Sequence, residues 1–305
     1  MSGRRVTITG ATGLIGPRLV RELQEGGWEV SVLTRDPERA RAKLGDVEAH
    51  KWDLMSEPAP AAALEGRDGV IHLAGEPVAQ RWSAAAKRAI RESREQGTEH
   101  LVAGLRAAEQ RPKVLVSSSA IGYYGPHGAE PIDEEAPPGV DFLAEVCRAW
   151  EAAAEAAAEL GMRVLVIRTG VVLDGDGGAL EKMLPPFKLG VGGPVAGGRQ
   201  FVPWVHADDV VGIMTAGLAD ERWSGVANAT APVPVTNSEF SKALGRALHR
   251  PAVLPVPGAA LRLLYGEMAE IITGGARVVP ARPLMLGYAF RHPELDEALR
   301  SALSG

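Results

Sequence analysis

The chain alternates between short apolar runs and longer segments with helical periodicity. Five apolar runs, at residues 5–9, 29–33, 69–73, 114–117 and 163–167, have the length and the β-branched content of buried strands. After the first run, Ile15, Leu19 and Leu23 recur at every fourth position, and the alanine-rich segments 83–108 and 142–160 have high helix propensity. Because parallel strands need crossover helices, this alternation predicts a doubly wound α/β fold.

The pattern changes after Gly170. Glycine and proline are concentrated in residues 174–203, which should resist a continuous helix and form a long loop region that carries substrate contacts. Helical patterns return at residues 238–248 and 259–272. We therefore expect a domain of residues 1–235 that includes the 174–203 loop, and a small C-terminal domain of residues 236–305 that packs on it.

Composition excludes several classes of protein. The 305 residues are 46% hydrophobic and 23% charged, as in ordinary globular chains, and the net charge of −5 argues against a nucleic-acid partner. No apolar stretch is long enough to span a membrane, and Arg4 and Arg5 lead into the first strand without the apolar segment of a signal peptide. The single cysteine, Cys147, cannot form an internal disulfide. We expect a soluble cytoplasmic protein.

Three glycines at intervals of three follow the first predicted strand. Gly10 allows a tight turn, Gly13 lets the backbone approach a pyrophosphate, and Gly16 lets the next helix pack closely on the strand. The helix N-terminus then directs amide N–H groups at the anion. This glycine turn predicts a dinucleotide site, rather than a turn without a ligand, with these contact residues: Gly10, Thr12, Gly13, Leu14, Ile15 and Gly16.

The end of the second predicted strand indicates which dinucleotide binds. Arg35 stands there, and a guanidinium can pair with the 2′-phosphate of NADP(H). Asp36 could instead accept a hydrogen bond from a ribose 2′-hydroxyl, which would favour NAD(H). We expect NADP(H) as cofactor. His72 either lines the cofactor or packs at its strand end. The other residues placed at strand ends to line the cofactor are Asp53, Leu54, Leu73, Ala74 and Gly75.

Five motifs follow one another along the chain, at residues 9–16, 72–75, 117–125, 168–170 and 204–209. In this order they resemble the extended short-chain dehydrogenases/reductases, which include nucleotide-sugar epimerases. Residues 141–151 and 274–299 resemble an atypical group described as epimerase-family proteins, which have a C-terminal domain of unknown function. The resemblance implies a Rossmann fold and a nicotinamide cofactor.

Typical members of that superfamily move a proton with a Tyr-x-x-x-Lys pair, and this chain has no such pair. Its four tyrosines are followed, four positions on, by His127, Gly128, Ala269 and His292. By the resemblance, the positions of the pair fall near Leu143 and Cys147, and neither side chain can do that chemistry. Arg94 also stands where extended members usually carry an asparagine.

Four residues could still carry chemistry: Ser119, Tyr123, Tyr124 and Arg94. The resemblance makes Ser119 the active-site hydroxyl, although a serine at a strand end can also simply cap local backbone. Tyr123 or Tyr124 could supply a phenol whose pKa is lowered by Arg94, or both rings could fill the core.

Two further groups of polar residues are candidate ligands. His206, Asp208 and Asp209 could bind a metal, but we expect no metal site, with Asp208 or Asp209 capping a helix and His206 packed in the core. Arg199 and Gln200 could grip an anionic substrate or lie exposed in a loop.

The sequence therefore predicts an NADP(H)-dependent oxidoreductase or epimerase-like enzyme that acts on a small molecule, anionic if Arg199 is a ligand. The alternative is a non-catalytic NADP(H)-binding sensor, because the usual proton route is missing. We expect a monomer or a homodimer.

Overall fold

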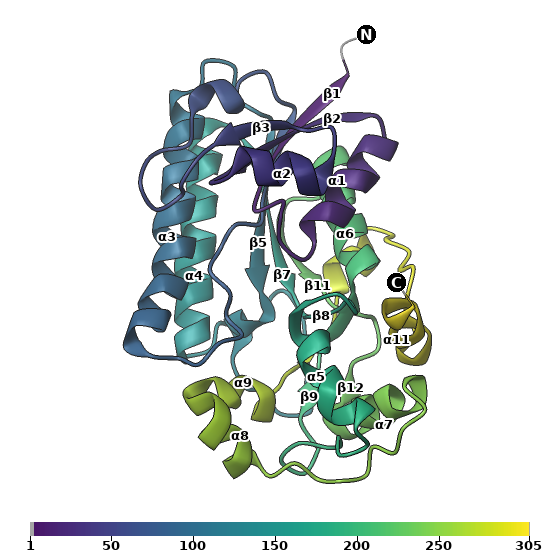
Figure 1. Ribbon diagram of the computed structural model, residues 1–305. Coiled ribbons are helices and arrows are strands. Elements are labelled where there is room, and N and C mark those ends of the chain that lie inside the picture. Colours follow the sequence, from purple (N-terminus) through teal and green to yellow (C-terminus); the bar gives the residue numbers. More distant parts are fainter. Residues whose placement is uncertain (1–2, 305) are drawn as a thin grey trace.

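A parallel seven-stranded sheet forms the centre of the computed structural model, which describes residues 3–304 (Figure 1). The strand order is β11-β7-β5-β4-β1-β2-β3. In that order the strands are Gly225–Ala229, Arg163–Thr169, Val114–Ala120, Gly69–His72, Arg4–Thr9, Trp28–Thr34 and Glu48–Lys51. The order reverses direction between β1 and β4, so the predicted doubly wound α/β fold is confirmed.

Helices cover both faces of the sheet (Figure 1). α1 (Gly16–Glu25) and α6 (Ala207–Ala219) lie on one face, and α3 (Ala84–Ala107) and α4 (Phe142–Glu155) lie on the other. α2 (Pro37–Leu44) packs beside α1 and β3. The 3-10 segments η1, η2 and η3 are Ala61–Ala63, Ile121–Tyr124 and Ala156–Leu160. Each face has its own apolar core because the strands of a parallel sheet are buried on both sides.

All five predicted strands are present, but β5 and β7 extend beyond their apolar runs, to Ala120 and Thr169. Apart from Ala120 the added positions are polar, so the apolar pattern does not reveal them. Ser119 of β5 pairs in register with Arg168 of β7. The extension therefore places two polar side chains at the carboxyl edge of the sheet.

The expectation of a continuous loop over residues 174–203 is wrong. The segment contains an eleven-residue helix, α5 (Gly178–Lys188), with Pro185 and Pro186 inside it. Leu180, Leu184 and Phe187 recur at helical spacing and are buried. Burial of this apolar stripe outweighs the loss of amide donors at the two prolines.

Besides the apolar cores on the two faces of the sheet, the molecule has a separate core at the carboxyl edge of the sheet, which we call the second core. It combines α5, α7 (Asn237–Ala247) and α11 (Leu295–Leu303) with Leu173 and Trp204. The short strand pairs around it are β8 (Val171–Leu173) with β10 (Trp204–His206), and β9 (Phe201–Val202) with β12 (Val235–Thr236). Residues on both sides of position 235 build this core, and the boundary between residues 1–235 and 236–305 stays a prediction.

The predicted helix at residues 259–272 is divided into three pieces. α8 (Gly258–Tyr265) ends at Gly266, whose φ is +63°, and η4 (Gly266–Met268) leads into α9 (Ala269–Thr273). The chain then pairs β13 (Arg277–Val278) with β6 (Pro131–Ile132) and forms α10 (Ala281–Met285). Within residues 3–304 no helix has the length and apolar character needed to cross a bilayer.

Replacing Leu299 by alanine tests whether α11 is part of the second core. Leu299 is fully buried, so Leu299→Ala should lower the free energy of unfolding by roughly 2–5 kcal/mol in urea denaturation. Leu263→Ala is the control, because 79% of Leu263 is exposed, and its effect should stay within about 0.5 kcal/mol. Equal, small effects for both variants would mean that α11 does not contribute to the core.

Candidate functional site

The glycine turn between β1 and α1 has the geometry that its spacing predicts. Gly10 has a φ of +70°, and a Cβ there would lie 2.7–2.8 Å from backbone atoms of Leu73 and Ala74. A Cβ at Gly16 would lie 1.9 Å from a backbone oxygen of the turn. At Gly13 a Cβ would meet one atom within 4 Å, the Gly10 carbonyl oxygen at 3.2 Å. The outer side of Gly13 is therefore open to an approaching ligand.

The N-terminus of α1 is available for an anion. No side chain caps its first amides, and Pro17 in the first turn removes an N–H that has no helical partner anyway. Leu14 extends across the turn toward Gly177 and Gly178, while Ile15 packs against the core. The turn thus combines an open backbone with an uncapped helix end, which suits a pyrophosphate.

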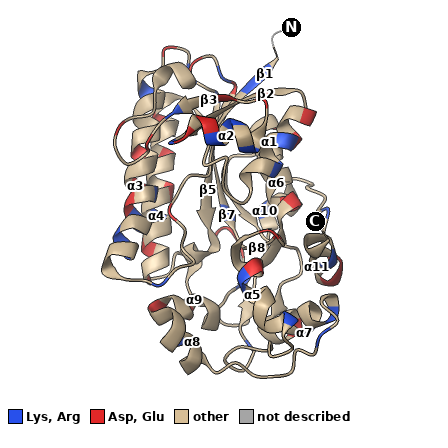
Figure 2. Ribbon diagram, viewed as in Figure 1, with Lys and Arg blue, Asp and Glu red and all other residues tan. Residues whose placement is uncertain are grey.

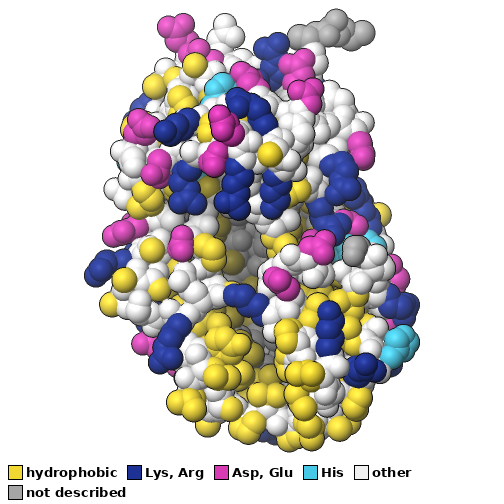
Figure 3. Space-filling view, in the orientation of Figure 1, with side chains coloured by type: hydrophobic (Ala, Val, Ile, Leu, Met, Phe, Trp, Pro, Cys, Tyr) yellow, Lys and Arg dark blue, Asp and Glu magenta, His cyan; other side chains and the backbone are white. Residues whose placement is uncertain are grey.

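Basic side chains gather beside this turn. The Asp36 carboxylate accepts from the Arg39 amide at 3.0 Å and caps α2, so Asp36 is already engaged. Arg35 is exposed and makes no side-chain hydrogen bond within residues 3–304. Lys43 Nζ donates to the Thr12 carbonyl at 2.9 Å. Figure 2 shows Lys and Arg positions along α2, and Figure 3 shows Lys and Arg side chains above a hollow in the middle of this face.

Asp53 and Leu54 follow β3 at the same edge of the sheet. Asp53 accepts hydrogen bonds from the Met55 amide at 3.0 Å and the Ser56 hydroxyl at 3.1 Å, so it shapes its own loop. Leu54 packs against Gly97 of α3. Both are half-buried, and their contact with a cofactor stays a prediction.

The loop after β4 contacts the glycine turn through Leu73 and Ala74. His72, just before it, is fully buried between Thr9 Oγ1 at 2.6 Å and Thr98 Oγ1 at 3.0 Å. Burial lowers the pKa of His72 to about 4. His72 is therefore a neutral link between β1 and α3, which agrees with the packing alternative.

A buried polar chain lies at the ends of β5 and β7. Ser119 Oγ donates to Glu151 Oε1 at 2.5 Å, and Arg168 binds the same carboxylate through Nε at 2.9 Å and Nη2 at 2.8 Å. All three are less than 10% exposed. Burial opposes the charge of Arg168, but its bonds to Glu151 outweigh that effect and raise its pKa. Glu151 and Arg168 are not among the predicted site residues. A glutamate among the alanines of α4 is the signal that could have identified Glu151.

The two adjacent tyrosines have different roles. Tyr124 is fully buried, donates to Asn228 Oδ1 at 2.7 Å and accepts from Arg168 at 3.0 Å. Burial raises the pKa of Tyr124 to about 12, so it stays a neutral phenol. Tyr123 is half-buried with its ring 3.3 Å from the Arg168 guanidinium carbon. The Tyr123 hydroxyl has no hydrogen-bond partner among the described residues, which leaves it free for a ligand.

The cation beside both tyrosines is Arg168 and not, as expected, Arg94. Arg94 Nη1 donates to the carbonyls of Glu76 at 2.9 Å and Ile90 at 3.1 Å, and the guanidinium lies over the Trp150 ring. It also packs against the backbone at Gly75. Burial lowers the pKa of Arg94. Arg94 therefore supports the loop after β4.

Cys147 stands at the position where the superfamily's lysine is expected. It is buried, and its sulfur lies 3.6 Å from the Ala120 carbonyl oxygen. Burial raises the pKa of the Cys147 thiol to about 12. The thiol is therefore protonated and supplies neither a nucleophile nor the positive charge of a lysine.

The polar residues after position 198 are arranged differently from the expectation. Gln200 Nε2 donates to the Val195 carbonyl in its own loop and to the Ile272 carbonyl in α9, whereas Arg199 is exposed. The cap of α6 is His206, whose Nδ1 accepts from the Asp208 amide at 3.1 Å. Asp209 instead accepts from two amides of the segment before α11. The expectation that Asp208 or Asp209 caps the helix is wrong, and His206 is packed as expected.

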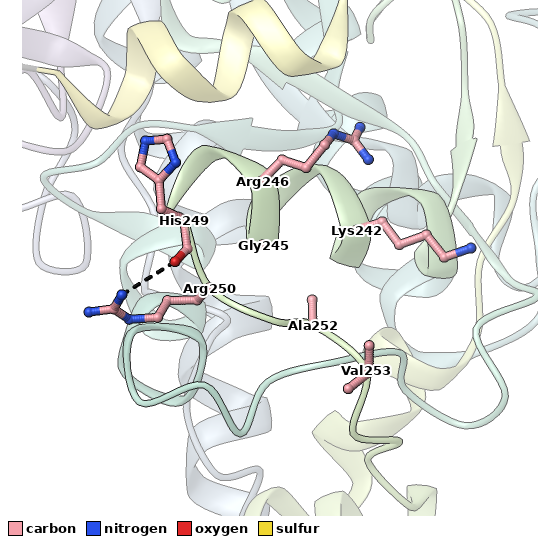
Figure 4. Close-up of a pocket in the computed structure, with 7 residues that line it drawn as sticks. All are labelled: Lys242, Gly245, Arg246, His249, Arg250, Ala252 and Val253. Atoms are coloured by element: carbon pink, nitrogen blue, oxygen red, sulfur yellow. Dashed lines mark hydrogen bonds between the residues drawn. The ribbon is translucent and has the colours of Figure 1, made fainter.

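A separate hollow lies at the end of α7 (Figure 4). It is lined by Lys242, Gly245, Arg246, His249, Arg250, Ala252 and Val253. Arg246 pairs with Asp296 at 2.8 Å, and the charged ends of the basic residues that line the hollow do not converge on one point in Figure 4. Without converging groups this hollow is no candidate for chemistry, and the carboxyl edge of the sheet remains the candidate site.

Comparison with known proteins shows the family of this chain. Residues 6–227 match the NAD dependent epimerase/dehydratase family, and residues 256–302 match a domain of unknown function, DUF1731. The chain is 41% identical to "Epimerase family protein SDR39U1 homolog, chloroplastic" of Arabidopsis thaliana, over 98% of this chain and 86% of the relative. It is 37% identical to "Epimerase family protein SDR39U1" of Bos taurus, over 98% of this chain and 100% of the relative.

A solved structure extends the likeness to three dimensions. The crystal structure of human epimerase family protein SDR39U1 (isoform 2) with NADPH matches this fold with a TM-score of 0.88 and 35% identity, over 99% of both chains. That relative was crystallised with NADPH, and this chain shares its fold along nearly the whole length.

The neutral state of His72 predicts a pH dependence of stability. Its pKa is about 4 in the native state and 6.5 ordinarily, so only the unfolded chain gains a proton as the pH falls from 6.5 toward 4. The contribution of neutral His72 to the free energy of unfolding is therefore complete above pH 6.5. Below that pH the contribution declines, by about 2 kcal/mol at pH 5. The free energy of unfolding, measured by urea denaturation, should therefore differ less between pH 7.5 and pH 5 for His72→Gln than for the wild type.

The control for this test is His127→Gln, because His127 is exposed. It should keep the pH difference of the wild type. A His72→Gln chain that loses as much stability between pH 7.5 and 5 as the wild type would contradict the assignment.

Proposed function

Because the chain belongs to the NAD dependent epimerase/dehydratase family, we propose that it is an NADP(H)-dependent oxidoreductase or epimerase-like enzyme. The observation that carries the proposal is at the end of β2. Asp36 is engaged in capping α2, whereas Arg35 is exposed beside the open glycine turn. A free guanidinium at this position suits a 2′-phosphate, and an engaged carboxylate is poorly placed to bind a ribose hydroxyl.

The residues around the glycine turn fit NADP(H). The open side of Gly13 and the uncapped start of α1 would hold the pyrophosphate, and Arg35 would pair with the 2′-phosphate. Leu73, Ala74 and Gly75 would line the far side of the turn. When bound, the cofactor supplies or accepts the hydride.

Ser119 and Glu151 are proposed to replace the missing Tyr-x-x-x-Lys pair. A substrate oxygen bound at Ser119 would exchange a proton with the serine hydroxyl, and Glu151, at 2.5 Å, would take up or return the serine proton. Arg168 holds the Glu151 carboxylate by two hydrogen bonds, which orients it toward Ser119. Ser119 is then the catalytic residue, and Glu151 and Arg168 act through it.

The substrate is proposed to be a small molecule with a carbonyl or hydroxyl group. The free Tyr123 hydroxyl offers it a second hydrogen bond beside Ser119. Arg199, an exposed cation in the 174–203 segment, would suit an anionic group on it. The cytoplasmic location and the monomeric or homodimeric state stay predictions.

Arg35→Ala tests the choice of cofactor. Loss of the charged pair with the 2′-phosphate should weaken NADPH binding by roughly 10- to 100-fold, measured by isothermal titration calorimetry, and leave NADH binding nearly unchanged. Arg148→Ala is a matched control, because Arg148 is also exposed but lies on the outer side of α4. A loss of affinity for NADPH and NADH alike would argue against a 2′-phosphate contact.

Ser119→Ala tests the proton route. NADPH consumption should fall at least about 100-fold with any carbonyl compound that the wild-type chain reduces, while NADPH affinity stays the same. Ser118→Ala is the control, because neighbouring residues of a strand face opposite sides of the sheet. Full activity in Ser119→Ala would remove Ser119 from the mechanism.

The same assay separates the enzyme from the sensor alternative. A wild-type chain that binds NADPH tightly but reduces no compound in a broad carbonyl panel would favour a non-catalytic NADP(H)-binding module. Reduction of any member of the panel would exclude that alternative.

A further inference from the structure

A second cluster of ligating side chains lies outside the proposed cofactor and proton-transfer residues. His206, Asp208 and His292 each offer one ligand atom, and these atoms lie within 4.8 Å of one another. His206 and Asp208 stand at the junction of β10 and α6, whereas His292 comes from the segment before α11. The cluster therefore joins parts of the chain that are far apart in sequence.

Two of the three spacings between these donors match a small metal ion. His292 Nε2 lies 3.3 Å from Asp208 Oδ2, and His206 Nδ1 lies 3.6 Å from the same oxygen. Around zinc, bonds of about 2.0–2.1 Å place neighbouring tetrahedral ligands about 3.3 Å apart. We propose that His206, Asp208 and His292 bind a divalent transition metal ion, best matched by zinc, with water in the fourth position.

Neighbouring residues orient two of the three ligands. Glu297 lies 2.9 Å from Nδ1 of His292, so the carboxylate can fix the tautomer in which Nε2 presents its lone pair to the ion. Arg18 donates to Asp208 Oδ1 at 3.0 Å and leaves Oδ2 for the metal. A carboxylate behind a ligating histidine is a common feature of zinc sites.

The third ligand, His206, is 98% buried, and it must exchange one interaction to bind the ion. Its Nδ1 accepts from the Asp208 amide at 3.1 Å in this structure, and coordination replaces that hydrogen bond. Its Nε2 has no hydrogen-bond partner among the described residues. The Asp208 amide is therefore the one hydrogen-bond partner of the ring among the described residues. Imidazole and carboxylate donors together suit zinc better than magnesium or calcium.

A bound ion would connect the two cores of the molecule. Asp208 lies in the first turn of α6, which packs on the sheet, and His292 precedes α11, which belongs to the second core. Because the three ligands are brought together only by folding, the ion should stabilise the native chain. Through Arg18, which also contacts Asp174, the site reaches α1 directly after the glycine turn.

The test uses the full chain after removal of metal with a chelator. Titration with zinc, followed by calorimetry, should show one ion per chain and a rise in melting temperature. Cobalt at the same stoichiometry should give the intense visible absorption of a tetrahedral site. His292→Gln should weaken zinc binding at least 100-fold, and Glu297→Gln, which changes only the residue behind the ligand, should weaken it about 10-fold.

His249→Gln is the matched control, because His249 is exposed at the end of α7, away from the cluster. It should bind zinc as the wild type does. His292 is a better target than the deeply buried His206 because its replacement is less disruptive, and denaturation of metal-free His292→Gln checks that it folds. No bound zinc in the wild type, or equal affinity in the wild type and folded His292→Gln, would overturn the proposal.

Discussion

The close contact between two backbone segments at the sheet edge determines where the candidate site lies. β1 and β4 are neighbours and point the same way, so the turns that follow them meet. Gly10 lies so close to Leu73 and Ala74 that no side chain fits between them. His72 secures the same junction through Thr9 and Thr98. This contact holds the open side of Gly13 and the start of α1 in one fixed geometry, on which the proposed pyrophosphate site depends.

A buried ion pair organises the other half of the site. Taking Glu151 and Arg168 out of water is costly, and the cost is offset because the two bonds between them satisfy both charges. The result is a carboxylate in a fixed position with Ser119 bonded to it. Tyr124 and Asn228 complete the network on the far side of Arg168. A chain without the usual Tyr-x-x-x-Lys pair thus still has an ordered polar group at the carboxyl edge of the sheet.

The sequence predicted those features that depend on local pattern. The five strands, the glycine turn and the resemblance to epimerase-family proteins are confirmed. α5 was missed because proline and glycine content hid a short apolar stripe. The pairing of Glu151 with Arg168, and of His292 with Asp208, depends on long-range folding. Asp36 followed by Pro37 is a local signal of a helix N-cap that the prediction did not use, whereas the free side chain of Arg35 is a property of the folded loop.

The central claim is that the glycine turn and Ser119 serve one bound cofactor. A crystal structure of this chain with NADPH tests it most directly. The account predicts the pyrophosphate at Gly13, the 2′-phosphate against Arg35 and the nicotinamide ring beside Ser119. A cofactor whose nicotinamide end is separated from Ser119 by protein side chains, or whose 2′-phosphate lies away from Arg35, would contradict it.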